Sequence, residues 1–585
     1  MEPSRTTRLT AWLLLAVALL FSSGVRWRLL DFPLERDEGE YAYAGQLILH
    51  GVPPYQAAYN MKLPGVYLAY AGGMAVFGQT VSGVHLTLIV ANLAAIALVF
   101  FLAKDLFDPL AGGFSALVYS LLALGPSVLG MAAHATHFVA LFGVAGAWAL
   151  WRAISSDRKS LMAASGLLLG IAFLMKQQGV FLIAFGGLAV VIHDLARRPR
   201  GWRKLSADLP LFVLGAILPY ALTCLWLWHA GVFGRFWFWT VDYARQYVQQ
   251  VSSAEEAWMY FRGTFFDSMV ASCWPLWVAA TAGLFTVGIA KGDRKAKWFA
   301  YGFFVFAFLC VCPGFLFRAH YFIAWLPAVA IFAGAACSQM ILFSLRPPKT
   351  ADSHRSESAR KQKTADGRRE KSAVAETVPA PFYGLLWAVV FVLVVGFGIV
   401  INGSKDFFFF IPPKLLCQYT YFPNPFVESQ EIADFIRSHT TPDQTIAVLG
   451  SEPQLYFLSQ RRSATGYIYT YALMERQDFA LKMQQEMAKE IEQSKPEFVV
   501  YVGFSLRFSW LWRPNSQFYI FEWCERFLQS DYRPVGLVVI AARDKPAIFI
   551  WGDQAAGIWD TQAAKLRLKP QAVPLVWIFQ RKNAR

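Results

Sequence analysis

The chain has 585 residues, and 54 Lys and Arg against 39 Asp and Glu give it a net charge of +15. Hydrophobic residues make up 56% and charged residues only 16%, against roughly 25% charged residues in soluble proteins, and mean hydropathy is +0.38. This balance excludes a soluble globular protein. The excess positive charge does not indicate a nucleic-acid partner, because the basic residues gather in loops between the predicted membrane spans.

Apolar runs long enough to cross a bilayer recur along the chain, and the first, at about 12–25, follows Arg5 and Arg8. No small-residue cleavage site follows this run, so we expect an uncleaved first helix and not a signal peptide. Ten further spans are predicted at 83–103, 110–130, 137–151, 161–175, 178–193, 209–229, 269–290, 298–316, 322–345 and 382–401. About eleven spans place the two ends of the chain on opposite sides of the membrane.

The loops between these spans separate by charge. Basic clusters occur at 152–159, 197–204, 291–297 and 346–371, which fall on one side, and the positive-inside rule makes that side cytoplasmic. The outer loops 31–82 and 230–268 are instead rich in acidic and aromatic residues, respectively. We therefore expect a cytoplasmic N-terminus and an outer location for everything after about Gly403.

The predicted organisation has four parts. Residues 1–345 form a membrane region, 346–380 a disordered basic cytoplasmic linker, 381–402 the last transmembrane helix, and 403–585 a small extracytoplasmic α/β domain. Four short apolar runs in the last part, 446–450, 498–503, 535–540 and 547–551, predict buried strands, with helical patterns near 428–438 and 473–493. The fold class is thus an all-α polytopic membrane protein with a small α/β domain.

The seven cysteines show no spacing typical of a zinc site. Only Cys417 and Cys524 lie outside the predicted spans. In an oxidising compartment these two could form a disulfide, and a pair of free thiols is an equal alternative.

The first outer loop carries the most informative residues. Asp37 and Glu38 lie just beyond the first span and precede an amphipathic stretch that ends at His50-Gly51, as a short helix on the bilayer surface would. On spacing alone, a solvated acidic loop is favoured over acid–base chemistry. Lys62 precedes a stiff Leu-Pro-Gly turn, where its ammonium could bind a lipid phosphate or could snorkel to the interface without function.

Two other outer segments carry candidate polar residues. His134 and His137 are spaced i, i+3 and would share one helix face, but two histidines fall short of the usual three metal ligands, so hydrogen-bonding roles are favoured. Arg318 is a candidate for binding phosphate because His320 and Tyr321 lie within three residues of it. Weaker candidates, which could equally snorkel, are Lys176, Arg235, Arg245 and Arg262.

The first loop resembles that of a known superfamily. Asp37-Glu38, Tyr41-Ala42, His50-Gly51 and the run from Tyr59 to Pro64 are similar to the first extracytoplasmic loop of GT-C integral-membrane glycosyltransferases. The nearest groups resemble bacterial relatives of protein O-mannosyltransferases and of the lipid A aminoarabinose transferase, in glycosyltransferase families 39 and 83. Segments at 173–177, 318–328 and 448–461 extend the resemblance, in order, over nearly the whole chain.

The resemblance implies an inverting transferase that uses a polyprenyl-phosphate-linked sugar at a site between the outer loops and the bilayer. It implies that Asp37 is catalytic, that Lys62 binds the donor phosphate and that Tyr321 lies near the donor. Beside these we expect Glu38 as a further catalytic residue, and Arg318 and Tyr321 as further residues that bind the donor phosphate. A carboxylate can deprotonate an acceptor hydroxyl while cations stabilise the departing phosphate.

The chain departs from the family pattern at two positions. Met61 stands where the aminoarabinose transferase has Glu, and His137 stands where the family has an acidic residue in the second outer loop. His137 and His320 would then orient the substrate. We expect no metal, with His134 and His137 as the weak possibility for a divalent ion.

The function that follows is transfer of a sugar to a cell-envelope glycan, lipid A-like lipid or protein, at the outer face of a bacterial inner membrane. One alternative is a transporter of lipid-linked sugars or polysaccharides, but the sequence shows no internal repeats, and its acids lie in loops and not at mid-membrane. Another is an inert glycan-binding scaffold, which the missing second carboxylate leaves open.

Overall fold

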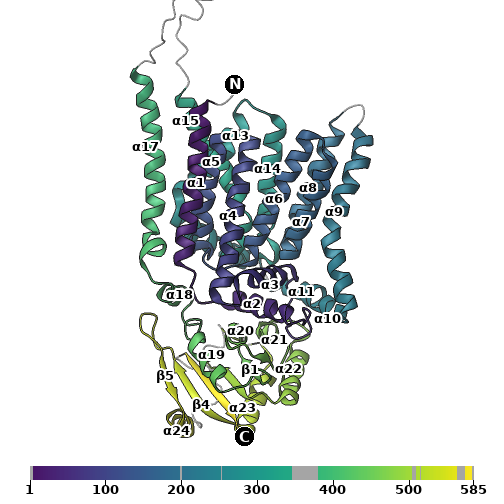
Figure 1. The fold of residues 1–585 in the computed structure, drawn as a ribbon, viewed down its shortest axis with the longest axis vertical. Helices are drawn as coiled ribbons and strands as arrows, with labels where there is room; N and C mark the ends of the chain where they lie inside the picture. Colours follow the sequence, from purple (N-terminus) through teal and green to yellow (C-terminus); the bar gives the residue numbers. More distant parts are fainter. Residues whose placement is uncertain are drawn as a thin grey trace, which may run out of the picture.

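A computed structural model describes residues 4–197, 201–251, 253–345, 380–503, 509–513, 515–562 and 574–582. A bundle of long helices forms one half of the molecule and a sheet with covering helices forms the other (Figure 1). The N-terminus lies at the far end of the bundle and the C-terminus at the far end of the sheet (Figure 1). This arrangement agrees with an odd number of membrane crossings, whereas the sidedness of the membrane stays a prediction.

Each of the eleven predicted spans overlaps a helix. These helices are α1 (Arg5–Arg28), α4 (Val81–Leu106), α5 (Pro109–Leu124), α6 (Ala135–Ser156), α7 (Lys159–Met175), α8 (Val180–Leu195), α9 (Gly201–His229), α13 (Ala271–Ile289), α14 (Arg294–Leu309), α15 (Leu326–Ser344) and α17 (Ala380–Gly403). Among the described residues, eight helical segments are long and apolar enough to cross a membrane. The helices α5, α7, α8 and α14 are shorter, at 16, 17, 16 and 16 residues, and α8 counts among the eight only together with the preceding turn at 177–179.

Two short helices, α2 (Arg36–Leu49) and α3 (Gly65–Phe77), lie across the end of the bundle that faces the sheet (Figure 1). A reciprocal capping box starts α2, since the Glu35 side chain accepts from the Glu38 amide and the Glu38 side chain accepts from the Glu35 amide. Most of α2 is buried. The expected short helix is thus present, with His50 as its C-cap, and its contact with a bilayer stays a prediction. The sheet half also packs on it.

Six strands form one mixed sheet in the order β2-β1-β3-β6-β4-β5. They are β1 (Thr445–Leu449), β2 (Arg462–Ser463), β3 (Phe498–Val502), β4 (Tyr532–Val539), β5 (Ile548–Trp551) and β6 (Leu575–Arg581). Strand β1 runs parallel to β2 and β3, whereas β6 pairs antiparallel with β3 and β4. The predicted strands correspond to β1, β3, β4 and β5, and the sequence analysis did not predict β2 and β6.

Six helices accompany the sheet: α19 (Ser429–Ser438), α20 (Gln454–Ser459), α21 (Tyr471–Met474), α22 (Ala480–Ser494), α23 (Tyr519–Asp531) and α24 (Asp553–Gln562). We call the described residues of 429–582 the sheet region. It meets the bundle end through α20, which packs on α2, and through Tyr471 of α21, which accepts a hydrogen bond from Arg36 of α2 (Figure 1). The short helix α18 (Pro413–Tyr421) connects the sheet region to α17.

Two sequence predictions concern the connections. The predicted linker at 346–380 lies outside the described residues except for its last residue, which begins α17. Cys417 and Cys524 are both buried and both free, so the disulfide alternative is not realised.

Candidate active site

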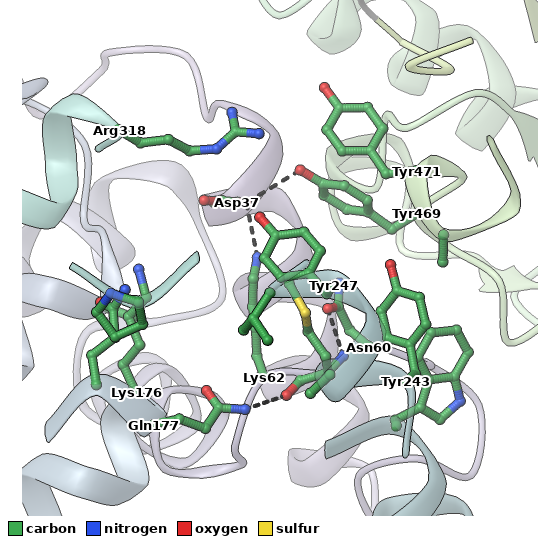
Figure 2. Close-up of a pocket in the computed structure, with 18 of the residues that line it drawn as sticks. Asp37, Asn60, Lys62, Lys176, Gln177, Tyr243, Tyr247, Arg318, Tyr469 and Tyr471 are labelled. Carbon is green, nitrogen blue, oxygen red and sulfur yellow. Dashed lines mark hydrogen bonds and ion pairs between the residues drawn. The ribbon is translucent and has the colours of Figure 1, made fainter. Parts of the chain in front are cut away.

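A cavity of about 200 Å³ lies where the bundle, α2 and the sheet region meet. Segments far apart in the sequence line it together: α2, the loop 59–62, the α7–α8 junction at 175–178, residues 239–248, residues 313–321 and the sheet-region segment 469–475 (Figure 2). Of the residues predicted from sequence, Asp37, Lys62, Arg318, His320 and Tyr321 line this cavity.

Lys62 joins two carboxylates of α2. Its Nζ lies 2.8 Å from Oδ1 of Asp37 and 2.8 Å from Oε2 of Glu40. Glu40 also accepts hydrogen bonds from Tyr67 Oη at 2.6 Å and from Asn60 Nδ2 at 2.9 Å. The spacing i, i+3 puts Asp37 and Glu40 on one face of α2, so a single ammonium reaches both. Glu40 is therefore a second carboxylate that the sequence analysis had not singled out.

These contacts fix the charges at the centre of the site. Burial alone would raise the pKa of Asp37, but Lys62, His320 and His134 outweigh burial and hold this pKa well below its usual range. Burial raises the pKa of Glu40 despite the contact with Lys62. The two carboxylates overcome the effect of burial on Lys62 and raise its pKa well above the usual value. Asp37 is thus ionised and Lys62 is protonated at neutral pH.

Two further cations line the cavity without a carboxylate partner. In the described part of the chain, neither Lys176 nor Arg318 forms an ion pair within 4.0 Å. Lys176 Nζ lies 3.6 Å from the centre of the Tyr321 ring, a cation–π contact. Burial, with smaller contributions from Lys62 and Arg318, lowers the pKa of Lys176 to about 7. An anion such as phosphate is the partner that these two cations lack.

A carboxylate and two imidazoles converge beside these cations. One ligand atom each of Asp37, His134 and His320 lies within 4.8 Å of the others. The rings of His134 and His320 stack with centres 4.2 Å apart, and neither ring nitrogen of His134 has a hydrogen-bond partner among the described residues. Burial lowers the pKa of His134 to about 4 and lowers that of His320 as well, so both are neutral, as metal ligands must be. This donor set suits a divalent ion.

His137 lies away from this group, contrary to the expected pairing with His134. It is 1% exposed and does not line the cavity. The expected shared helix face is wrong because His134 is the N-cap of α6, with an extended backbone (ψ 147°), and only His137 lies within the helix. A role for His137 in orienting the substrate has no geometric support.

Glu38 also lies outside the cavity lining, so the predicted catalytic role has no support from its position. It is fully buried, accepts a 2.6 Å hydrogen bond from the Ala133 amide, and lies 3.2 Å from Nε2 of His85. These contacts fix the loop that leads into His134. The solvated acidic loop is likewise excluded, because Glu38 and Glu40 are at most 1% exposed.

Among the weaker candidates, only Lys176 contributes to the cavity. Arg235 lies 3.3 Å from Glu486, and Arg262 lies 3.9 Å from Asp267, both at the surface. Arg245 does not line the cavity.

The fold and parts of the sequence match known proteins. A family model described as dolichyl-phosphate-mannose-protein mannosyltransferase matches residues 62–228. The solved structure of ArnT from Cupriavidus metallidurans bound to undecaprenyl phosphate superposes with a TM-score of 0.54 at 18% identity, covering 84% of this chain and 92% of that one. At this identity the superposition shows a shared fold.

Two other proteins are similar to this chain, one in part of its sequence and one in its fold. An undecaprenyl phosphate-α-4-amino-4-deoxy-L-arabinose arabinosyl transferase from Pseudomonas aeruginosa is 29% identical over 261 residues, 41% of this chain and 44% of that protein. The chain thus matches less than half the length of this curated relative. The oligosaccharyltransferase AglB from Archaeoglobus fulgidus, in complex with an inhibitory peptide and a dolichol-phosphate, has a TM-score of 0.53 at 13% identity, covering 94% of this chain and 75% of that one.

The sheet region contributes residues that sequence reasoning had not assigned to the site. Tyr469, Tyr471 and Glu475 line the cavity, and Tyr469 Oη lies 3.3 Å from Oδ1 of Asp37 (Figure 2). On the same side, Tyr243 Oη donates to the Glu475 carboxylate. No local pattern marks these tyrosines, because their role depends on contacts between residues more than 400 positions apart.

Proposed function

We propose that this protein is a GT-C glycosyltransferase, which transfers a sugar from a polyprenyl-phosphate-linked donor to a cell-envelope acceptor at the outer face of a bacterial inner membrane. The observation that carries the proposal is the cavity in which ionised Asp37 lies beside Lys62, Lys176 and Arg318. A base for the acceptor and cations for the departing phosphate are the two requirements of such a transfer.

In the proposed reaction, an acceptor hydroxyl attacks the anomeric carbon of the sugar in a single displacement with inversion. The hydroxyl proton passes to Asp37, a new bond forms between the acceptor oxygen and the anomeric carbon, and the bond from that carbon to the phosphate oxygen breaks. The polyprenyl phosphate leaves with its electron pair. Lys176 and Arg318, which form no ion pair among the described residues, bind the departing phosphate. Lys62 adds a further positive charge next to Asp37.

An apolar groove supports a lipid-linked substrate. About 510 Å³ of it lies between α3, α4, α6 and α7, and Met175 lines both the groove and the cavity. Lys176 follows Met175 directly, so a phosphate at Lys176 would lie at the end of an apolar surface. A molecule with an anionic head and a hydrocarbon chain fits this change of polarity.

Asp37, His134 and His320 fit a divalent metal ion, as described above. When bound, such an ion would supply Lewis acidity next to the phosphate-binding cations.

The test compares envelope glycans and lipids by mass spectrometry in cells that lack the gene and carry either the wild-type protein or Asp37→Asn. We expect one glycosylated species to return with the wild type only, at equal amounts of protein in the membrane. Unchanged profiles with and without the wild-type gene would reject the transferase. Release of polyprenyl phosphate by the purified protein separates transfer from transport, since a transporter leaves the sugar–phosphate bond intact.

A further inference from the structure

We propose that Tyr469 of the sheet region is a positioning residue for Asp37: its hydroxyl holds one carboxylate oxygen so that the other faces the acceptor. The proposal rests on the proposed function, because it assigns Tyr469 a role in the step that Asp37 performs. It also makes the sheet region a component of the active site.

The two oxygens of Asp37 have different surroundings. Oδ1 lies 2.8 Å from Lys62 Nζ and 3.3 Å from Tyr469 Oη, so two donors from different parts of the chain hold it (Figure 2). Oδ2 lies 4.0 Å from His320 Nε2, beyond hydrogen-bond distance. Two donors on one oxygen fix the rotation of the carboxylate, and Oδ2 is then the oxygen that accepts a proton. A general base needs this kind of fixed orientation.

The Tyr469 ring also contacts the other donor. Lys62 Nζ lies 5.3 Å from the centre of this ring and 4.6 Å from the centre of the Tyr41 ring. The ammonium is thus placed by two carboxylates and two aromatic faces. The hydroxyl of Tyr469 contacts Asp37 and its ring contacts Lys62, so a substitution that removes only the hydroxyl separates the two contacts.

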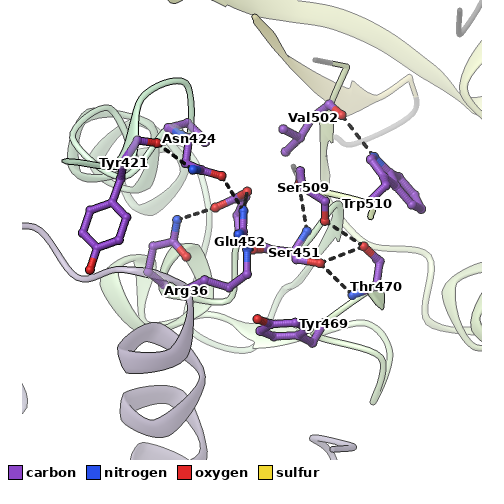
Figure 3. Close-up of polar contacts among 12 residues, drawn as sticks. Arg36, Tyr421, Asn424, Ser451, Glu452, Tyr469, Thr470, Val502, Ser509 and Trp510 are labelled. Atoms are coloured by element: carbon purple, nitrogen blue, oxygen red, sulfur yellow. Dashed lines mark hydrogen bonds and ion pairs between the residues drawn. The ribbon is translucent and has the colours of Figure 1, made fainter. Parts of the chain in front are cut away.

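The backbone around Tyr469 is tied to α2 through the residue that precedes Asp37. Arg36 donates to the Ser451 carbonyl, and at 2.8 Å to Tyr471 Oη and to Glu452. Ser451 in turn accepts from the Thr470 amide at 3.0 Å (Figure 3). The two residues that follow Tyr469 are therefore linked to Arg36, Tyr471 directly and Thr470 through Ser451. The distance between Asp37 and Tyr469 is set by this network and not by one long hydrogen bond alone.

The first test is Tyr469→Phe, which removes the hydroxyl and keeps the ring. We expect kcat to fall about 10-fold, the lower end for a lost hydrogen bond to a charged group, with KM for the polyprenyl-phosphate donor within about twofold. Tyr467→Phe is the matched control: its hydroxyl donates to Glu486 at 2.8 Å, outside the cavity lining, and its removal should leave kcat unchanged. Equal kcat in Tyr469→Phe and wild type would overturn the proposal.

A double mutant shows whether Tyr469 acts through Asp37. In an Asp37→Asn background, adding Tyr469→Phe should cause no further loss of the residual rate, because the group it positions is already absent. If the double mutant instead lost activity by the product of the two single-mutant losses, Tyr469 would act independently of Asp37, and this would also overturn the proposal. A wild-type protein without transferase activity would instead reject the proposed function, so the two failures are distinguishable.

A second pair of variants covers the case in which Tyr469→Phe is not recovered as folded protein. Tyr469→Gln offers an amide donor, whereas Tyr469→Leu, of similar size, offers none. At equal thermal stability, we expect Tyr469→Gln to retain more activity than Tyr469→Leu. Equal losses in the two variants would count against a hydrogen bond to Asp37.

Discussion

Arg36 and Glu452 form a salt bridge of 2.8 Å between α2 and the sheet region, with side chains 10% and 0% exposed (Figure 3). A buried ion pair adds little net stability, but removing one partner leaves a buried charge that is costly. We therefore expect the pair to determine the position in which the sheet region docks on α2 and to add little to the free energy of docking. Since Arg36 directly precedes Asp37, that position matters for the candidate active site.

The first prediction concerns this pair. Glu452→Ala should reduce the free energy of unfolding by about 3 kcal/mol, the lower end for breaking a buried pair, because Arg36 loses its charged partner. Thermal unfolding in detergent measures the change. Asp434→Ala is the control: it breaks a pair with Arg437 in which both side chains are about half exposed, 46% and 45%, and should cost less than about 1 kcal/mol. Equal shifts in the two variants would argue against a docking role.

The second prediction concerns the base. Asp37→Asn keeps the size of the side chain and removes the carboxylate, so turnover should fall roughly 100-fold or more while donor affinity changes little. Glu38→Gln should retain more activity and chiefly lower thermal stability, because Glu38 holds the Ala133 amide and lies outside the cavity lining. Turnover and melting temperature of both variants check this assignment. The opposite ranking would move the base to Glu38.

The apolar runs predicted the helices of the bundle well, because a bilayer requires long stretches without charge. Strands β1 and β3 were predictable for a similar reason, since they are buried along nearly their whole length. Strand β5 was predicted as buried but is an edge strand with no fully buried residue, so there the apolar run predicted the strand and not its burial. The burial of α2 was not predictable. Its alternation of acids and aromatics is typical of a water-exposed face, but α2 packs against both α3 and α20, so the end of the bundle and the sheet region together remove it from water.

For the site, the sequence analysis identified Asp37 and Lys62 because both lie in one loop with a distinctive pattern. It did not identify Tyr469, whose hydroxyl reaches Asp37 across 432 positions, nor rank Lys176 above other basic residues. It chose His137 over His134 because the family resemblance aligned His137 with an acidic residue, and a sequence pattern does not reveal that a helix starts between the two histidines. Contacts between distant segments and the exact start of a helix are the two features that sequence patterns did not provide.

The third prediction uses the titration of Lys176. Because burial lowers its pKa to about 7, Lys176 is protonated below that pH and loses its charge above it. The kcat/KM for the donor, which reports the free enzyme, should therefore fall as pH rises through about 7. Lys62 does not titrate there, since its pKa is raised well above the usual value. A pH series on the purified protein checks this.

Two variants assign that pH dependence. Lys176→Arg keeps its charge across the range and should remove the fall in kcat/KM near pH 7. Lys176→Ala should weaken donor affinity at low pH by about 1.5 to 3 kcal/mol, the range for a hydrogen bond to a charged group. An unchanged pH profile in both would exclude Lys176 as the titrating group.

The last prediction concerns a metal ion. The sequence favoured a metal-independent site because His134 and His137 are only two ligands, but Asp37, His134 and His320 supply three, the number usual in catalytic zinc sites. We therefore expect the purified protein to bind one equivalent of Zn²⁺ or another divalent ion, measured by elemental analysis after dialysis. His134→Ala and His320→Ala should lose this ion, whereas His137→Ala, which removes a buried histidine outside the group, should keep it. Chelation should reduce turnover, and a divalent ion should restore it. Full activity after removal of the ion would support the expectation from sequence, and Asp37 would then act with Lys62, Lys176 and Arg318 as the only charged groups needed.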